Sequence, residues 1–302
     1  MSSELRAPTL DDLPELTAFF AGLRDKYGSR GQNETQLRDY LTSRHANVPE
    51  NFRIVLEDGR VSGWIALWCP QGALDRVYFH IEASPREAGM YRRLLDWGEE
   101  RAAELGSGLR LQATVEGNDD AFVEEVRRRG YELVRHFFDM ETDLDEEPLE
   151  PHWPEGISVR TFWPGDERAI YDADLEAFED HWDPVDIGFD EWREYFLESS
   201  DFEPELWFLA EEREELVGFS LCTGERRPNT GYVNVLAVRR PWRNRGLGTA
   251  LLLHSFRELR RRGRAKADLN VDGDNLTGAL RLYERAGMHV VRRYDHYWRE
   301  LA

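Results

Sequence analysis

The feature that most constrains the fold of this chain is an internal repeat. Gly246 matches Gly89 at an offset of 246 − 89 = 157 residues, and Gly287 matches Gly130 at the same offset. Self-similarity at a fixed spacing indicates that one structural unit has been used more than once. The 302-residue chain is therefore predicted to contain two copies of one α/β unit.

The boundary between the copies is marked by composition. An acidic, proline-containing stretch at 145–151 reads as a connection between folded segments. We predict a first domain over 1–146, a linker over 147–156 and a second domain over 157–302. A copy of about 150 residues is long enough to bury a core of its own.

The segment 233–252 predicts a strand that passes through a glycine-containing loop into an amphipathic helix. Its first six residues are mainly apolar and β-branched, and leucines then recur at helical spacing. Gly246 and Gly248 leave the first amides of the helix accessible to an anion. The spacing matches neither a Walker loop nor a dinucleotide-binding fingerprint.

The loop instead resembles the pyrophosphate loop of the GCN5-related N-acetyltransferases, the GNAT superfamily. The matching residues are Arg243-Asn244-Arg245-Gly246-Leu247-Gly248, and the stretch 275–288 is similar to a second family signature. The resemblance implies an α/β (α+β) protein with two tandem GNAT folds, each a mixed, mostly antiparallel twisted sheet flanked by helices. It also implies acetyl-CoA as the cofactor and no metal.

The same resemblance implies which residues contact acetyl-CoA. The strand residues Leu236, Ala237 and Val238 are expected to pair with the pantetheine arm, and an amide of Leu236 or Ala237 to polarise the thioester carbonyl. The pyrophosphate is expected on Arg243, Asn244, Arg245, Gly246, Leu247, Gly248 and Thr249. Asn275 and Tyr283 complete the set, although Asn275 is equally well explained as a helix N-cap.

Three residues are candidates for catalysis. Tyr283 is the expected acid, because a phenol with a pKa of roughly 10 can protonate a leaving thiolate. Many relatives carry a glutamate base on the strand before the loop, but this strand has no carboxylate. Asn234 alternates onto one face with Tyr232 and Leu236, where it can contact the substrate or hold a water. His181 is the remaining candidate base, and an incidental loop histidine is the alternative.

The acceptor site is expected in the segment 177–184, between the first two helices of the second copy. Asp180, His181, Trp182 and Asp183 combine negative charge with an aromatic wall suited to a cationic amine. Tyr232 and Asn234 are expected to line the same site.

The first copy lacks residues of the second copy's glycine-containing loop. At the offset of 157, Gly248 is replaced by Tyr91, Arg245 by Ala88 and Asn244 by Glu87. We therefore predict a degenerate GNAT-like domain without an acetyl-CoA site, its tyrosine obstructing a diphosphate. A tandem arrangement with one degenerate half resembles the mycothiol synthase family.

Charge and composition limit the partners. The chain has 39 basic and 59 acidic residues, a net charge of −20, which argues against nucleic acid. It has no apolar run of the roughly 18 residues that span a membrane, so a cytoplasmic location is expected. Cys69 and Cys222 show neither a disulfide framework nor metal-ligand spacing.

The sequence thus predicts an N-acetyltransferase that transfers an acetyl group from acetyl-CoA to a primary amine of a small molecule by direct attack in a ternary complex. An amino sugar, an aminoglycoside-like compound and a cysteinyl or amino-acid amine are the acceptor classes considered. The alternatives are a non-catalytic acyl-CoA sensor or scaffold, and an acetyltransferase for protein N-termini or lysines. A monomer or homodimer is expected.

Overall fold

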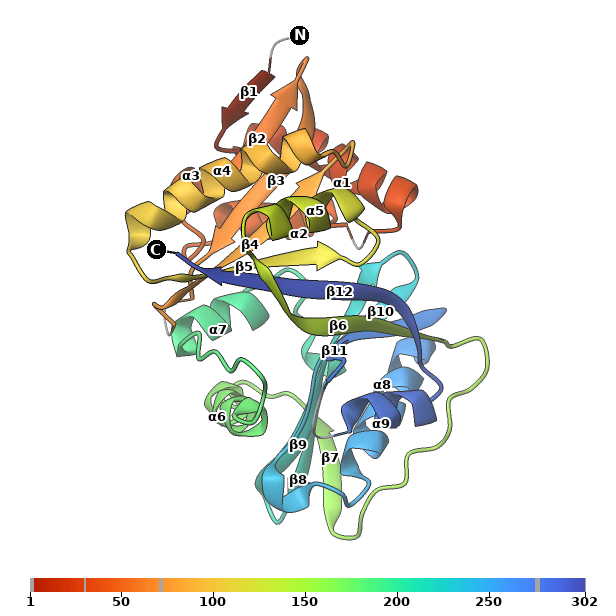
Figure 1. The fold of residues 1–302 in the computed structure, drawn as a ribbon. Helices are drawn as coiled ribbons and strands as arrows, with labels where there is room; N and C mark the ends of the chain where they lie inside the picture. The colour runs from red at the N-terminus through yellow and green to blue at the C-terminus, as the bar shows by residue number, and fades with distance from the viewer. Residues whose placement is uncertain (1–2, 30, 71–72, 275–277, 302) are drawn as a thin grey trace. The chain divides into compact units, whose positions relative to one another are not determined.

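The computed structural model describes residues 3–29, 31–70, 73–274 and 278–301. Contacts divide the chain into two compact units (Figure 1). Unit 1 contains Met1–His136 and Arg293–Ala302, and unit 2 contains Phe137–Arg292.

The sheet of unit 1 has the strand order β1-β2-β3-β4-β5-β12. Its strands are β1 (Ser3–Arg6), β2 (Phe52–Glu57), β3 (Arg60–Trp68), β4 (Arg76–Ala83), β5 (Arg110–Glu116) and the end of β12 (His289–Glu300). Neighbouring strands are antiparallel except β4 and β5, which are parallel. Strand β4 alternates buried and half-buried residues, as expected for a strand whose one face meets a core.

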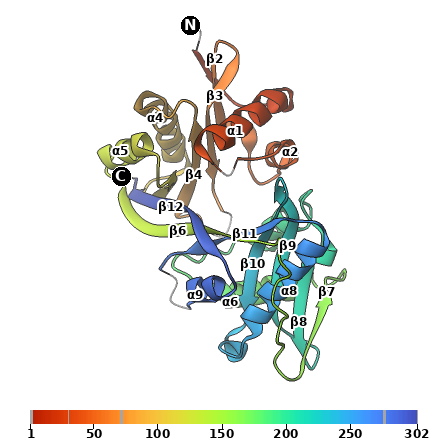
Figure 2. The same cartoon turned by 90° about the vertical axis from the view of Figure 1, so that its right-hand side faces the viewer.

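Helices cover both faces of this sheet (Figure 2). One side carries η1 (Leu10–Asp12), α1 (Leu13–Tyr27), α2 (Glu34–Thr42) and α3 (Val48–Asn51), around a core that includes Phe20 and Trp64. The other side carries α4 (Ala88–Leu105) and α5 (Asp120–Arg128), packed on Phe79 and Leu111.

The sheet of unit 2 has the matching order β7-β8-β9-β10-β11-β6. Its strands are β7 (Ile157–Thr161), β8 (Trp207–Glu212), β9 (Glu215–Arg227), β10 (Thr230–Val238), β11 (Lys266–Asp272) and the end of β6 (Glu132–Asp143). Again the pairs are antiparallel except one, the parallel pair β10 and β11. The predicted mixed, mostly antiparallel sheet is confirmed for both units.

Helices also cover both faces of the second sheet, and Figure 1 shows α6 and α8 on opposite sides of it. One side carries α6 (Glu167–Phe178) and α7 (Phe189–Phe196), with a core around Trp192 and Phe219. The other side carries α8 (Leu247–Arg261) and α9 (Ala279–Arg285), packed on Val233 and Leu269. Short 3₁₀ turns η2 (Pro204–Leu206) and η3 (Arg240–Trp242) precede β8 and α8.

The two halves of the sequence exchange their last strands. Residues 294–300 of β12 pair with β5 in unit 1, and residues 137–143 of β6 pair with β11 in unit 2. Each sheet is therefore completed by a strand from the other half of the chain. The proposed sequence boundaries at 146 and 157 remain a prediction about the repeat, because the contacts follow this exchange.

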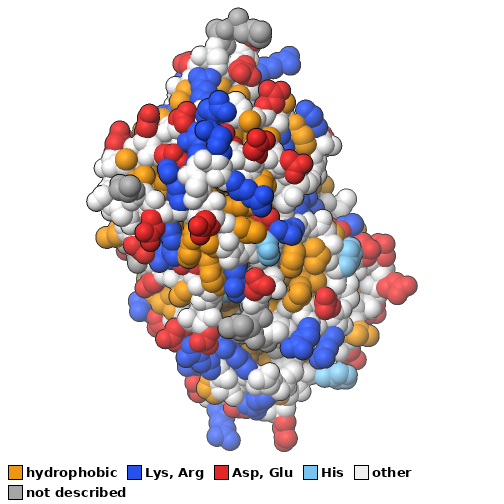
Figure 3. Space-filling model, in the orientation of Figure 1, with side chains coloured by type: hydrophobic (Ala, Val, Ile, Leu, Met, Phe, Trp, Pro, Cys, Tyr) orange, Lys and Arg blue, Asp and Glu red, His pale blue; other side chains and the backbone are white. Residues whose placement is uncertain are grey.

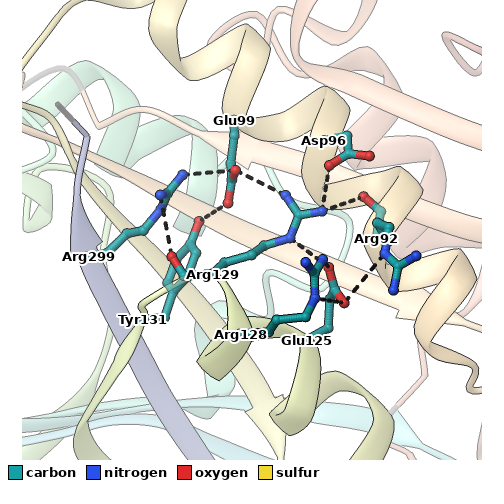
Figure 4. A network of polar contacts seen from close by, with 8 residues as sticks. All are labelled: Arg92, Asp96, Glu99, Glu125, Arg128, Arg129, Tyr131 and Arg299. Carbon is teal, nitrogen blue, oxygen red and sulfur yellow. Dashed lines mark hydrogen bonds and ion pairs between the residues drawn. The ribbon is translucent and has the colours of Figure 1, made fainter.

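A polar network fastens the exchanged strand in unit 1 (Figure 4). Arg299 of β12 forms an ion pair with Glu99 of α4 at 2.8 Å, and its guanidinium lies 5.1 Å from the ring centre of Tyr131. The Tyr131 hydroxyl and Arg129 also bind Glu99, at 3.1 and 3.0 Å. Arg129 reaches Glu125 at 2.8 Å as well, so α4, α5 and β12 share one network.

The segment predicted as a linker is held against α8 of unit 2. Arg257 donates to the carbonyl of Pro148 at 2.9 Å, and Arg260 donates to that of Leu144 at 2.8 Å. The ring of Trp153 lies 5.7 Å from that of His254. Two arginines of α8 thus bind the main chain.

Surface charges are interspersed, and basic side chains lie beside acidic ones on the face drawn in Figure 3. Many charged side chains of the surface form ion pairs, such as Arg168 with Asp172 and Arg262 with Glu203. Within the described part of the chain, no helix combines the length and the apolar composition needed to cross a membrane.

Candidate functional site

Strands β10 and β11 part from each other within the sheet of unit 2. Their parallel ladder runs from Thr230 and Lys266 only to Tyr232 and Asp268, although both strands continue. On its other side β10 stays paired with β9, with a bulge at Asn234 between Val233 and Val235. A bulge adds one residue and bends its strand. Main-chain groups of β10 beyond Tyr232 are thus left without their β11 partners.

The residues 236–238 lie on this unpaired side of β10. Leu236 and Ala237 remain in register with Ser220 and Phe219 of β9. Because successive amides of a strand point in opposite directions, one of these two amides faces β9 and the other faces the gap. The geometry fits the strand-like pairing with an extended arm that the sequence predicts for Leu236, Ala237 and Val238.

The loop after β10 ends in an open helix N-terminus. Asn244 and Gly246 have φ values of 62° and 86°, and Gly246 is the N-cap of α8. No side chain caps this helix, because its N-cap is a glycine. The amides of Leu247, Gly248 and Thr249 lie in the first turn, where the helix itself offers no acceptor. These donors and the positive end of the helix fit a pyrophosphate.

The two arginines of the loop, Arg243 and Arg245, bind other groups of the chain and so help to hold the loop in place. Arg243 donates to the carbonyls of Val238 and Ala177, at 3.1 and 2.9 Å, and reaches Asp180 at 3.3 Å. Arg245 forms an ion pair with Glu212 at 3.1 Å. Both guanidiniums, expected from the sequence to add cations for an anion, therefore already bind carboxylates of the chain. The main-chain amides are the donors of this loop that would be left for an anion.

Close packing gives a second reason for a glycine at position 248, besides the access to the helix amides inferred from the sequence. A Cβ placed there would lie 3.2 Å from Cδ1 of Leu282 and 3.6 Å from Cγ2 of Val238. The missing side chain thus lets α8 pack closely against α9 and β10. At Gly246 a Cβ would meet nothing within 4 Å, so its positive φ is what favours glycine.

Tyr283 is buried on α9, next to the parted strands. Its side chain is 8% exposed, and in the described part of the chain no residue hydrogen-bonds its hydroxyl. Burial and the neighbouring Tyr232 raise the pKa of Tyr283 to about 12. The phenol therefore keeps its proton at neutral pH. Asn275, the other expected cofactor contact, lies outside the described residues.

Asn234 is held by a neighbouring strand. Its side-chain nitrogen donates to Oγ1 of Thr223 on β9 at 2.6 Å. Next to it on β10, Tyr232 is buried and carries the guanidinium of Arg226 over its ring at 4.0 Å. An amide is not a base, so this strand contributes hydrogen bonds to the site and no proton acceptor.

The predicted acceptor segment follows α6, and its members differ in position. Asp180 is exposed and binds Arg240 with both carboxylate oxygens, at 3.0 and 2.7 Å, and Arg240 lowers its pKa. His181 is half-buried, and its Nε2 lies 4.0 Å from Oδ2 of Asp272. Trp182 and Asp183 are also half-buried. His181 thus lies beside Asp272 of β11.

Unit 1 also has a parted pair of parallel strands, but the helix that follows begins in a different way. The parallel ladder of β4 and β5 ends at Phe79 and Ala113, but α4 begins at Ala88 after Glu87, whose φ is −132°. Ala88 corresponds to Arg245, since 88 + 157 = 245, so α4 begins two positions earlier than α8. The left-handed glycine cap of unit 2 has no counterpart there.

The side chain of Tyr91 is buried in the core of unit 1, whereas the sequence suggested that it would stand in the way of a diphosphate. Its ring is 1% exposed and stacks on Phe122 at 4.4 Å, and its hydroxyl donates to Asp119, whose pKa burial raises. The residues that occupy this end of the strands are Arg86 and Glu116, an ion pair of which both side chains are 8% exposed.

Sequence reasoning missed residues whose role depends on tertiary contacts. They are Thr223, which holds Asn234, Glu212, which accepts from Trp242 and Arg245, and Asp272, which faces His181. Hydrogen bonds from Trp242 and Arg245 lower the pKa of Glu212. The one available signal was alternation: Asp268, Asn270 and Asp272 are polar at every second position of a strand. Among the described residues, no group of three His, Cys, Asp or Glu could hold a metal.

Comparisons with known proteins agree with this geometry. The Acetyltransferase (GNAT) family matches residues 168–288. The mycothiol acetyltransferase of Streptomyces scabiei is 36% identical over 185 residues, 60% of this chain and 59% of that protein. The mycothiol acetyltransferase of Geodermatophilus obscurus is 31% identical over 258 residues, 80% and 79% of the two chains. The match to the Streptomyces protein thus spans about three fifths of that relative's length.

Two solved structures share the fold over almost the whole chain. A GCN5-related N-acetyltransferase from Sphaerobacter thermophilus has a TM-score of 0.80 and 32% identity, covering 99% of this chain and 95% of that one. A tandem GNAT protein from the clavulanic acid biosynthesis pathway has a TM-score of 0.77 at 19% identity, covering 99% and 98%. The second likeness concerns the fold alone.

Proposed function

Because the chain belongs to the GNAT acetyltransferase family, we propose that its second copy transfers the acetyl group of acetyl-CoA to a primary amine of a small molecule. The transfer takes place by direct attack in a ternary complex. The observation that carries this proposal is the bulge at Asn234 and the parting of β10 from β11, next to the uncapped N-terminus of α8. Parted strands and free helix amides offer an extended, anion-bearing ligand two kinds of main-chain contact.

The proposed cofactor contacts are those expected from the sequence. The gap-facing amide of Leu236 or Ala237 polarises the thioester carbonyl, and the amides after Gly246 hold the pyrophosphate. Tyr283, which keeps its proton at neutral pH, protonates the leaving thiolate. Bound acetyl-CoA supplies an activated acyl group, and the protein supplies orientation and proton transfer.

The acceptor is proposed to bind on the α6 side of the parted strands. Tyr232, Asn234 and the loop Asp180, His181, Trp182 and Asp183 are the proposed contacts. The relatives named mycothiol acetyltransferases make a cysteinyl amine the first acceptor to test. The strand before the loop lacks the glutamate that many members carry, so amino sugars, aminoglycosides and amino acids belong in the same panel. A cytoplasmic monomer or homodimer remains a prediction.

Unit 1 is proposed to bind no acetyl-CoA. Its helix α4 begins without a left-handed glycine, and the carboxylate of Glu87 stands at its N-cap. The ion pair of Arg86 with Glu116 is buried at the end of β5. One acetyl-CoA per chain is therefore expected by calorimetry, and two equivalent sites would contradict this.

Two glycine variants test the site, with one as the control for the other. Gly246 is the N-cap of α8, and Gly263 follows its C-cap residue, Arg262. Their φ values are 86° and 79°, and a Cβ at either would meet nothing within 4 Å. A β-branched residue at either position costs roughly 1–2 kcal/mol of backbone strain. Gly246→Val should weaken acetyl-CoA binding at least about tenfold, whereas Gly263→Val should not. Equal affinities would refute the assigned pyrophosphate site.

Release of free thiol from acetyl-CoA across the amine panel tests the reaction. Turnover with one amine, lost in Gly246→Val, supports a small-molecule acetyltransferase. Stoichiometric binding without turnover would favour the sensor or scaffold, and turnover only with peptides would favour a protein acetyltransferase.

A further inference from the structure

Strand β10 carries no carboxylate and no histidine. Asn234, at the bulge of β10, donates its amide nitrogen to Thr223. The amine attacking a thioester must lose a proton, because an ammonium has no lone pair. A proton acceptor is therefore needed from another element of unit 2.

His181 reaches the sheet from the loop after α6. Its backbone amide donates to the carbonyl of Phe178 at 2.8 Å, which continues the turn of the helix. Its ring lies 6.0 Å from that of Phe178 and 6.3 Å from that of Phe137 on β6. The imidazole is 25% exposed, so two aromatic rings limit its movement while one side remains accessible.

Asp272 lies on the same side of the sheet. Ala267, Leu269 and Val271 of β11 belong to the core under α8 and α9. Because side chains alternate along a strand, Asp272 points to the opposite face, where α6 and α7 pack. Its side chain is 2% exposed, and its Oδ2 faces Nε2 of His181 at 4.0 Å.

The register of the strands places Asp272 and His181 level with the residues proposed to bind the thioester. Tyr232 is opposite Asp268, so the residue opposite Asp272 is Leu236 before the bulge is counted. The extra residue at Asn234 shifts this position to Ala237. Leu236 and Ala237 are the residues whose gap-facing amide is proposed to polarise the carbonyl.

Asp272 is itself oriented by the chain. Its Oδ1 accepts a hydrogen bond from the amide of Asp274 at 3.0 Å, which turns Oδ2 towards His181. A carboxylate fixed in this way selects one tautomer and one orientation of a facing imidazole.

We propose that Asp272 is a positioning residue that holds His181 as the general base of the acceptor site. This inference rests on the proposed acetyl transfer. A small rotation brings Nε2–H of His181 into hydrogen-bond distance of Asp272 and leaves the lone pair on Nδ1.

The proton transfers then balance. Nδ1 of His181 takes one proton from the acceptor ammonium, and the amine uses its freed lone pair to form the C–N bond. As the C–S bond breaks, its electron pair stays on sulfur, which takes the proton of Tyr283. The new amide nitrogen releases its second proton to water, the imidazolium also releases its proton to water, and Tyr283 recovers one from water. One proton is released overall.

Kinetics of the full-length chain test the coupling. With the amine found in the panel, we expect His181→Ala to lower kcat about 10²-fold and Asp272→Asn at least about tenfold, with KM for acetyl-CoA unchanged. Asp272→Glu should restore part of the rate. In the His181→Ala background, Asp272→Asn should have no further effect. An equal loss in both backgrounds would overturn the proposal.

Histidine NMR gives a readout that does not depend on turnover. The signal of His181 is assigned by its loss in His181→Ala, and its titration midpoint should fall in Asp272→Asn, because a facing negative charge is removed. Of the charged residues close in sequence, Glu179 and Asp180 both bind Arg240, and Asp180 also binds Arg243. Asp183 is half-buried, and β6 contributes the uncharged Phe137.

Asp268→Asn is the matched control. Asp268 lies on the same face of β11 and is equally buried, but it binds Arg227. Removal of the Asp268 charge should leave the titration midpoint of His181 unchanged. It should also leave unchanged the low-pH side of a plot of kcat against pH. An unshifted midpoint in Asp272→Asn would overturn the pairing even in an active enzyme. A shifted midpoint in a chain that acetylates no amine would instead refute the proposed function and the base role together.

Discussion

Asp174 offers a quantitative test of the energetics of unit 2. It lies on α6, and within the described part of the chain its carboxylate accepts one hydrogen bond, from Nε1 of Trp192 on α7 at 3.3 Å. Burial raises its pKa from 3.8 to about 6, although the bond from Trp192 acts in the opposite direction. The folded protein therefore binds the proton of Asp174 more tightly than the unfolded chain does.

The sign of the pH dependence follows directly. Below pH 3.8 both states are protonated and the site costs nothing, whereas between 3.8 and about 6 the unfolded chain ionises first. The free energy of unfolding therefore falls as pH rises through this window, by roughly 2.2 × 1.36 ≈ 3 kcal/mol in total. Above it the loss is constant.

Asp174→Asn should remove this cost and keep an acceptor for Trp192. We expect the variant to be more stable than the wild type by ~3 kcal/mol near pH 8 and by ~2 kcal/mol near pH 5.5, measured by urea unfolding. The control is Asp172→Asn on the same helix, which removes an exposed ion pair with Arg168 and should change stability by less than about 1 kcal/mol. A variant at Asp174 with no gain near pH 8 would show that the carboxylate is better solvated than its burial implies.

Three further outcomes are expected. Tyr283→Phe should lower turnover about 10²-fold with unchanged acetyl-CoA affinity by calorimetry, and full turnover would mean that water protonates the thiolate. Arg299→Met should destabilise unit 1 by roughly 1–3 kcal/mol in urea unfolding, because it leaves Glu99 with one cation fewer, whereas exposed Glu300→Gln should not. The fragment 152–302 lacks β6 and should show little hydrogen-exchange protection in β11, so native-like protection there would contradict the need for the exchanged strand.

Local chemistry explains what could be predicted from the sequence. The strand, the loop and the helix at 230–261 each have a strong local signal, namely apolar β-branched residues, a left-handed glycine and apolar residues at helical spacing. The loop was predicted from this stretch, and Tyr283 from the second family signature at 275–288. These features depend on neighbours in sequence, so a single sequence suffices to place them.

The exchange of strands could not be predicted in this way. The repeat aligns 134–135 with 291–292, and both segments do form the last strand of their half. An alignment of two copies shows that each ends in such a strand, but it does not show which sheet receives it. The pairing of Asp272 with His181 was missed for a similar reason, because 91 residues separate the two along the chain.

The two units provide an internal comparison of fold and function. Both part their parallel strands, at Tyr232 in unit 2 and at Phe79 in unit 1, so this gap belongs to the fold. They differ in the turn that follows, where Gly246 opens one helix N-terminus and Glu87 stands at the other. A carboxylate near the N-terminal amides stabilises a helix by the same electrostatics that would attract a phosphate. Unit 1 thus has a fixed carboxylate at the helix N-terminus where unit 2 has a glycine.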